Sequence, residues 1–191
     1  MAIDLSSIEN YLMKHDLRFM SFEERNFVAL GFPTTHYLDK DGDNHVTVII
    51  SLEEEGEYIK FFVPRCYVYR GPYKETLFQY LLMICFKTQM IQYEYDPEDG
   101  EIRAIIEFPI EDGTLTERQC MRSILSLVEV IDDVDTAIRS IMDGGVIPEN
   151  ISSGKPKQLK DSSSNEQEKQ KKVAEDCSTE DSEDSDDFDE I

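Results

Sequence analysis

The stretch that decides the fold runs from Tyr73 to Phe108 and reads YKETLFQYLLMICFKTQMIQYEYDPEDGEIRAIIEF. Its first half predicts a helix that is apolar on nearly every side, from Leu77 to Phe86. A surface helix carries one apolar stripe and a polar back, so a helix that is apolar all round needs cover on more than one face. We expect a sheet on one side, and another helix or a second copy of the chain on the other.

Two short strands follow this central helix. Residues Met90–Tyr95 and Ile102–Phe108 have strand character, and the intervening Asp96–Gly100 contains the Pro and Gly that favour turns. A buried helix followed by a hairpin is the nucleus of a small α+β domain. The stretch has no catalytic motif, so indications of function have to come from surfaces.

The segment before the central helix has a period of two. Three strands are predicted, at Phe27–Phe32, His45–Leu52 and Tyr58–Val68, and polar turns join them. Pro33 places the first strand at an edge or at a bulge. Successive strands joined by short turns form an antiparallel meander.

An amphipathic helix is predicted on each side of this core. Ser6–Glu9 fits a capping box for a first helix that ends near Asp16, and Thr116–Gln119 fits one for a long final helix. Gly144–Gly145 ends the final helix. Its outer face is predicted from charged residues: Glu117, Arg122, Glu129, Asp132, Asp133 and Asp135.

Composition divides the 191 residues into two parts. Residues 1–147 are predicted to form one α+β domain, an antiparallel sheet of meander plus hairpin with a buried central helix and two terminal helices. Residues 148–191 are rich in Ser, Asp, Glu, Lys and Gln. Such a segment cannot bury enough apolar surface to offset chain entropy, so it is predicted to be a disordered acidic tail. The tail fits a solubilising role, a docking segment for a basic protein, or a nucleic-acid mimic.

The charge narrows the classes of partner. There are 41 acidic and 19 basic residues, a net charge of −22, which disfavours nucleic acid and anionic membranes and favours basic or neutral proteins. No apolar run approaches the roughly 20 residues of a membrane-spanning helix, and the amino terminus lacks the basic region of a signal peptide. We therefore expect a cytoplasmic protein.

Residues that could bind metal or catalyse a reaction are scattered. Cys66, Cys85, Cys120 and Cys177 form no CxxC pair, which indicates free thiols in a reducing compartment. Asp39, Asp41 and Asp43 resemble the start of a calcium loop, but Asn44 and Ile50 stand where that loop needs Gly and Glu. His15, His36 and His45 lie apart, and no hydrolase, phosphate-binding or dinucleotide motif occurs. The sequence predicts no metal, no cofactor, no catalytic residue and no enzyme.

Aromatic residues are concentrated in and around the third predicted strand. Phe61 and Phe62 are adjacent, so their side chains leave opposite faces of the sheet. Aromatic residues of this kind fit the core. A second interpretation is an exposed apolar patch that binds a partner, with Phe62, Tyr67 and Tyr69 as the contact residues.

The order helix, meander, buried helix, hairpin and long helix resembles the YbjN-type domain, which shares the fold of the class I type III secretion chaperones. The resemblance covers about residues 3–145. It is carried by Leu77–Phe86, Gln92–Ile102, Phe108–Ile110 and Leu115–Gln119.

This resemblance implies a small acidic protein, usually a homodimer, that holds partner polypeptides on apolar patches of its sheet and helices. It supplies no catalytic residues to carry over. Because the central helix is apolar all round, we expect the dimer interface to include Phe78, Leu81, Leu82 and Cys85.

The sequence therefore predicts a non-catalytic protein-binding module, chaperone-like or regulatory. The alternative is a regulator that senses a small ligand in a pocket between sheet and helices, and an enzyme is a third, weaker interpretation. A closed pocket lined by convergent polar groups would favour the ligand or the enzyme. An open apolar groove and a two-fold interface would favour the binding module.

Overall fold

Three helices and six strands make up the part of the chain that the computed structural model describes, residues 3–111 and 113–147. The predicted acidic tail, residues 148–191, lies outside this range. The elements follow one another as α1 (Leu5–Lys14), β1 (Phe19–Phe22), β2 (Phe27–Pro33), β3 (His45–Glu53), β4 (Tyr58–Val68), α2 (Lys74–Lys87), β5 (Gln92–Tyr95), β6 (Glu101–Pro109) and α3 (Glu117–Gly144). Short 3₁₀ turns, Glu23–Arg25 and Glu54–Gly56, join β1 to β2 and β3 to β4.

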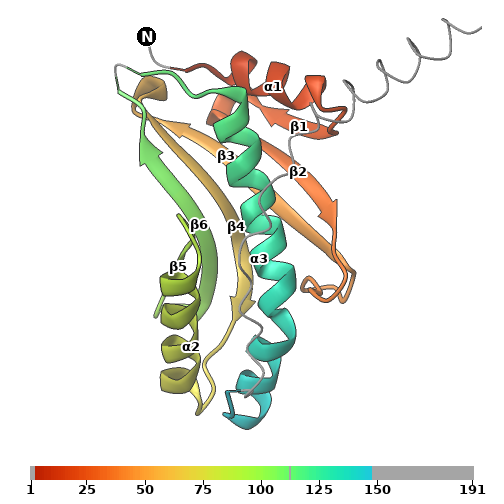
Figure 1. Cartoon of the computed structure of the whole chain (residues 1–191), viewed down its shortest axis with the longest axis vertical. Helices are drawn as coiled ribbons and strands as arrows, with labels where there is room; N and C mark the ends of the chain where they lie inside the picture. The colour runs from red at the N-terminus through yellow and green to blue at the C-terminus, as the bar shows by residue number, and fades with distance from the viewer. Residues whose placement is uncertain (1–2, 112, 148–191) are drawn as a thin grey trace, which may run out of the picture. The chain divides into compact units, whose positions relative to one another are not determined.

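The strands form a single antiparallel sheet in the order β1-β2-β3-β4-β6-β5 (Figure 1). The predicted α+β class, with its meander, its hairpin and a helix between them, is confirmed. The sequence did not predict β1. Its four residues, Phe19–Phe22, are too few to show an alternating pattern.

All three helices pack on the same face of this sheet. The rings of Phe78 in α2 and Tyr95 in β5 are 4.8 Å apart. The Tyr67 hydroxyl in β4 donates to Asp135 in α3 across 3.1 Å. Figure 1 shows α3 lying lengthwise over the strands, with α1 at one end and α2 beside β5. No helix of the described residues covers the opposite face, which we call the open face.

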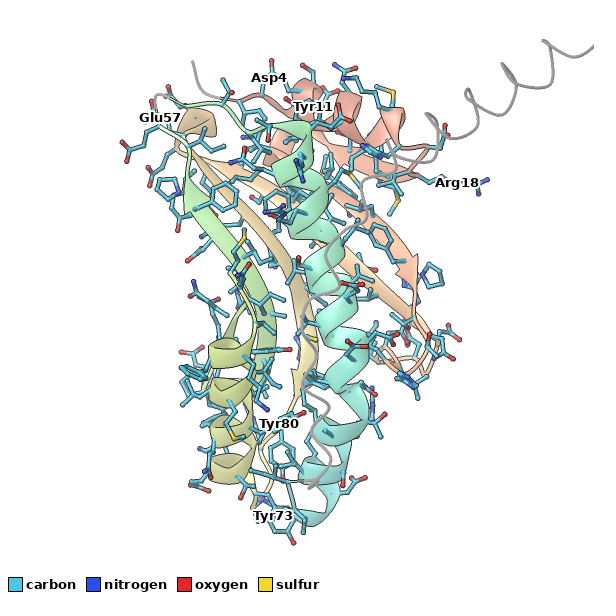
Figure 2. The ribbon with its side chains drawn as sticks, viewed as in Figure 1. Asp4, Tyr11, Arg18, Glu57, Tyr73 and Tyr80 are labelled. Atoms are coloured by element: carbon cyan, nitrogen blue, oxygen red, sulfur yellow. The ribbon has the colours of Figure 1, made fainter. Side chains whose placement is uncertain are left out.

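The core lies between the sheet and the three helices, and its side chains follow the two periods of the sequence. In β3, residues Val46, Val48, Ile50 and Leu52 are buried and alternate with more exposed neighbours. In α2, the buried side chains are Leu77, Tyr80, Leu81 and Ile84. Tyr80 lies at the level where α2 and α3 run side by side (Figure 2).

The predicted helix ends are confirmed for α3 but not for α1. Thr116 and Gln119 form the expected capping box, and Gly145, with a φ of 70°, ends α3 in the left-handed conformation that favours glycine. At α1 the predicted cap is wrong. The Asp4 carboxylate accepts the Ser7 amide at 2.8 Å, so this helix begins before the Ser6–Glu9 pair could cap it.

Asp132 of α3 fixes the connection between β2 and β3. The Asp132 carboxylate accepts the backbone N–H groups of Thr35, His36 and Tyr37 at 2.6–3.0 Å. Burial raises the pKa of Asp132, but these three hydrogen bonds outweigh it and hold the pKa below its ordinary value. The predicted place of Asp132 on the outer face of α3 is thus only partly right, because this connection covers its carboxylate.

Asp135 is buried, which contradicts its predicted place on the outer face. Its carboxylate accepts the Arg139 Nε–H at 2.8 Å and the Tyr67 hydroxyl, and Arg139 also donates to the Leu38 carbonyl at 2.6 Å. Burial raises the pKa of Tyr67 well above its ordinary value, so the phenol stays protonated and remains a donor. The buried charge is therefore paired and hydrogen-bonded, as its position requires.

We expect Asp135→Ala to lower the free energy of unfolding by about 1–3 kcal/mol, because Tyr67 and Arg139 lose their shared acceptor. Asp133→Ala is the matched control, since Asp133 is exposed on the same helix and the substitution removes the same charge. Urea denaturation of both variants measures the difference. Equal stability of the two variants would contradict the role given to Asp135.

Candidate binding surfaces

The open face carries a row of apolar side chains that crosses the sheet. Directly opposed residues of antiparallel strands project from the same face. The register opposes Met20 to Ala29, Ala29 to Ile49, Ile49 to Phe62 and Phe62 to Ile105. We call Met20, Ala29, Ile49, Phe62 and Ile105 the apolar row.

The members of the apolar row differ in accessibility, and the most exposed one lies on β1. Ile105 and Ala29 are buried among their neighbours, and Ile49 and Phe62 are half-buried. Met20, on the edge strand, is 65% exposed. Beside it, Phe22 is 40% exposed and its ring stacks on Phe27 at a centroid distance of 4.5 Å. The β1 side of the open face is thus the part with the most apolar surface left to bury.

Charged side chains border the apolar row on both sides. Lys60 lies 3.0 Å from Glu53 and 3.9 Å from Glu107, and the hydrogen bond with Glu53 helps raise the pKa of Lys60. On the other side, Arg103 pairs with Glu94 at 3.8 Å and Glu101 at 3.3 Å. Such half-exposed pairs contribute little to stability. They do confine the apolar surface to the middle of the sheet and to β1.

Of the three residues predicted to contact a partner, only Phe62 lies on the open face. Tyr67 and Tyr69 are buried on the helix side, where their hydroxyls donate to Asp135 and to the Met142 carbonyl. Tyr67 and Tyr69 lie at the same alternating positions as the buried Phe61 and Val63, and the bulge between Val63 and Tyr67 keeps this parity because it adds two residues to β4. The sequence signal that could have indicated this is the alternation itself, because Phe62 and Tyr67 are five positions apart and therefore point to opposite faces of a strand.

A second apolar surface lies on the outer side of α2. Leu82 is 70% exposed and Phe86 is 92% exposed, and with Met83 they line a shallow depression of about 350 Å³. Gln79 and Lys87 complete its lining, so the depression belongs to α2 alone. We call Leu82, Met83 and Phe86 the α2 surface.

The residues predicted for a dimer interface divide between this surface and the core. Leu82 is on the α2 surface, Leu81 is buried, and Phe78 and Cys85 are half-buried. Phe86 was not singled out from the sequence, although its position four residues after Leu82 places it on the same side of a helix. The apolar residues of α2 are thus divided between a side that is buried in the core and a side that is exposed.

The described residues contain no group of three or more His, Cys, Asp or Glu side chains that could hold a metal. His15 contacts Glu117 at 2.9 Å, whereas His36 and His45 are exposed. Cys66, Cys85 and Cys120 are free thiols. Burial raises the pKa of Cys66 far above its ordinary value and that of Cys120 to about 12, so neither is a reactive thiolate. None of the helices in residues 3–111 and 113–147 is long and apolar enough to cross a membrane.

The arrangement of sheet and helices matches that of a known protein. The crystal structure of YbjN from E. coli superimposes with a TM-score of 0.51 at 13% sequence identity, over 71% of this chain and 94% of YbjN. This chain shares the YbjN fold. At that identity the likeness to YbjN concerns the fold alone. No family model and no curated protein matches the sequence.

Two structures of protein complexes also contain similar chains. The HopA1–SchA chaperone–effector complex gives a TM-score of 0.46 at 11% identity, over 68% of this chain and 94% of that one. The ExsC–ExsE complex gives 0.47 at 14% identity, over 71% and 97%. Like YbjN, these chains differ from this one at most positions.

The opposite sides of α2 should respond differently to substitution. Leu81→Ala should lower the free energy of unfolding by about 2–5 kcal/mol, because it opens a cavity in the core. Phe86→Ser should change the stability of the protomer by less than about 0.5 kcal/mol, because that side chain is exposed. Denaturation at a concentration low enough to give only protomers measures both values. A large loss with Phe86→Ser would contradict the orientation of α2.

Proposed function

We propose that this protein is a non-catalytic protein-binding module, chaperone-like or regulatory, that holds a partner polypeptide on its open face. The observation that carries the proposal is the apolar row, which lies on a sheet face that no described helix covers and ends at the exposed Met20. Burying apolar surface contributes about 25 cal/mol per Å². A partner segment laid over Met20, Phe22 and Phe62 would gain this stabilisation without any chemical step.

The edge strand β1 supports the same assignment. Natural sheets protect their edges with Pro, Lys or inward-pointing charge, because an exposed apolar edge invites pairing with other chains. Residues Phe19–Phe22 contain none of these, and two of the four are exposed apolar side chains. An edge of this kind fits a protein whose partner covers it.

The alternative, a regulator that senses a small ligand, is less well supported. Ligand sites are concave and combine apolar walls with a few convergent polar groups. The α2 depression and a second one, lined by Ser7, Asn10, Tyr11, Met13 and Lys14 of α1, each lie along the outer side of one helix. Neither brings residues of the sheet and the helices together.

The proposal includes a cytoplasmic location and a contribution from the acidic tail. Free cysteines, two of them buried, fit a reducing compartment. The tail, residues 148–191, adds negative charge to an already acidic chain. Because exposed charges act mainly through steering, we expect the tail to influence the association rate with a partner more than the affinity.

We further propose a homodimer formed through the α2 surface. Leu82 and Phe86 offer apolar area there, and the helix carries Lys74 and Lys87 against one acid, Glu75. In a chain with a net charge of −22, such an element opposes self-association less than the rest of the surface does. The partner-binding open face and the dimer surface are then separate.

The binding proposal predicts that the apolar row matters more than the histidines. Once a pull-down from the native host has identified a partner, Phe62→Ser should weaken its binding about tenfold to a hundredfold, because a buried ring contributes roughly 1.5–3 kcal/mol. His36→Gln and His45→Gln should leave the affinity nearly unchanged. Calorimetric titration of each folded variant distinguishes the binding module from the ligand or enzyme alternative. If the His changes abolish binding and Phe62 is dispensable, the ligand or enzyme alternative is correct.

The dimer proposal predicts a loss of self-association when the α2 surface is made polar. Sedimentation at micromolar protein concentration should show a dimer for the natural chain and a monomer for Leu82→Ser combined with Phe86→Ser. Met13→Ser is the control, since Met13 is 56% exposed on α1 and lies outside this surface. A natural chain that stays monomeric would refute the proposal.

A further inference from the structure

One end of the sheet concentrates unpaired carboxylates. The turn between β1 and β2 and the turn between β3 and β4 lie side by side there, because Asn26 Nδ2 donates to the Leu52 carbonyl at 2.9 Å and the Leu52 amide donates back to Asn26 at 3.0 Å. Figure 2 shows Glu57 at this end. The carboxylates carried by the two turns are those of Glu23, Glu24, Glu54, Glu55 and Glu57, and we call them the acidic end.

The charge of the acidic end is not neutralised within the described part of the chain. None of its five carboxylates forms an ion pair among residues 3–111 and 113–147. Two bases are near. Lys60 is already shared between Glu53 and Glu107, and Arg25 lies in the β1–β2 turn. At the opposite end of the sheet, by contrast, Arg65 pairs with Asp99, and Arg70 donates to the Glu98 carbonyl. The acidic end therefore borders the open face with carboxylates that form no ion pair within the described residues.

The acidic end adjoins the most exposed apolar side chains of the open face. Phe22 immediately precedes Glu23 and opposes Phe27, and Phe27 in turn opposes Ser51, two residues before Glu53. A chain segment that covers Met20 and Phe22 would thus reach the acidic end within a few residues. At about 3.3 Å per residue of extended chain, neighbouring positions of one segment can contact both surfaces.

We propose that the open face selects polypeptide segments in which an apolar anchor is flanked on one side by Lys or Arg, with the apolar residues over Met20, Phe22 and Phe62 and the basic residues at the acidic end. This inference rests on the proposed function and adds the chemical class of the partner and the orientation in which it binds. Desolvated apolar contacts supply affinity, and complementary charge supplies orientation and selectivity.

Charge also argues against other occupants of this face. A second copy of the chain would bring its own acidic surface against the five carboxylates, and like charges in contact disfavour association. Nucleic acid and anionic lipid are excluded by the same repulsion. A basic partner segment is the occupant that turns this surface from repulsive to attractive.

Selection of peptides tests the inference without a known partner. A phage library of random short peptides is selected on the immobilised full-length protein at low salt, and the enriched peptides are then synthesised and titrated. We expect apolar residues at alternate positions with Lys or Arg on one side. Their affinity should fall at high salt, because the charges involved are exposed.

The decisive variant combines Glu54→Gln, Glu55→Gln and Glu57→Gln. It should weaken the enriched basic peptides about tenfold, since three exposed charges each contribute a fraction of a kcal/mol. The matched control combines Asp41→Asn, Asp43→Asn and Asp133→Asn, which removes the same charge from exposed positions outside the acidic end. The control should bind as the natural chain does. Circular dichroism confirms that both variants are folded.

The outcomes separate this inference from the proposed function. Peptides that require Met20 and Phe62 but have no basic flank, or that bind both charge variants equally, would refute the role proposed for the acidic end. They would still support the proposed function as a binding module. Peptides that tolerate Met20→Ser and Phe62→Ser overturn the binding module itself, as does a selection that enriches nothing. Self-association that Met20→Ser weakens would assign the open face to a second copy and overturn the inference.

Discussion

The packing of all three helices on one face of a six-stranded sheet is the constraint on which the rest of the structure depends. Ile8, Leu81 and Ile124, one from each helix, are buried in the same core cluster as the apolar side chains of one sheet face. An antiparallel sheet tolerates this arrangement when its other face is polar enough to meet water. Here the other face is polar at its margins but apolar along its middle row, so one-sided packing leaves surface available for a further polypeptide.

The position of the open face in turn depends on polar contacts within the helix layer. Asp132 and Arg139 of α3 hold the long connection between β2 and β3 through backbone groups of residues 35–38. This connection precedes the strand that carries Ile49, and it follows the strand that pairs with β1. A buried charge contributes little net stability when it is paired, but its removal is costly. The Asp135–Arg139 pair therefore serves to fix geometry more than to add stability.

Much of the fold could be predicted from periodicity. The alternation in Val46–Leu52 and the recurrence of apolar residues every three or four positions in α3 each indicate which side of an element is buried. Caps such as Thr116 mark where a helix begins. What could not be predicted depends on contacts between distant residues. β1 is a strand because it pairs with β2, and the four residues of Phe19–Phe22 show no pattern of their own. Asp135 was predicted to be an outer residue because the sequence does not show that Tyr67, 68 positions away, contacts it in the fold.

The candidate site was less predictable than the fold, for a related reason. The prediction grouped Phe62 with Tyr67 and Tyr69, although alternation places the two tyrosines on the opposite face, and the bulge at Pro64–Arg65, where Arg65 has a φ of 49°, keeps them in the core. Met20 could not be predicted as a partner-contact residue, because the strand that carries it, β1, was not predicted from the sequence. Likewise, a helix that is apolar on all sides, such as α2, does not show in its sequence which side meets the sheet. Side-chain exposure decides that question, and it identifies Phe86 in addition to Leu82.

The two exposed apolar surfaces differ in charge, and this difference could keep their occupants apart. Hydrophobic contact alone does not discriminate between partners, since any apolar surface can bury any other. Repulsive elements supply the discrimination. The α2 surface lies between Lys74 and Lys87, whereas the open face ends at the five carboxylates of the acidic end. Glu54 and Glu55 stand there in left-handed conformations that favour Gly or Asn, so the turn carries negative charge at a conformational cost. A surface built in this way disfavours a second acidic copy of the chain and favours a basic segment, so the proposed self-association and the proposed partner binding would use separate surfaces of one small domain.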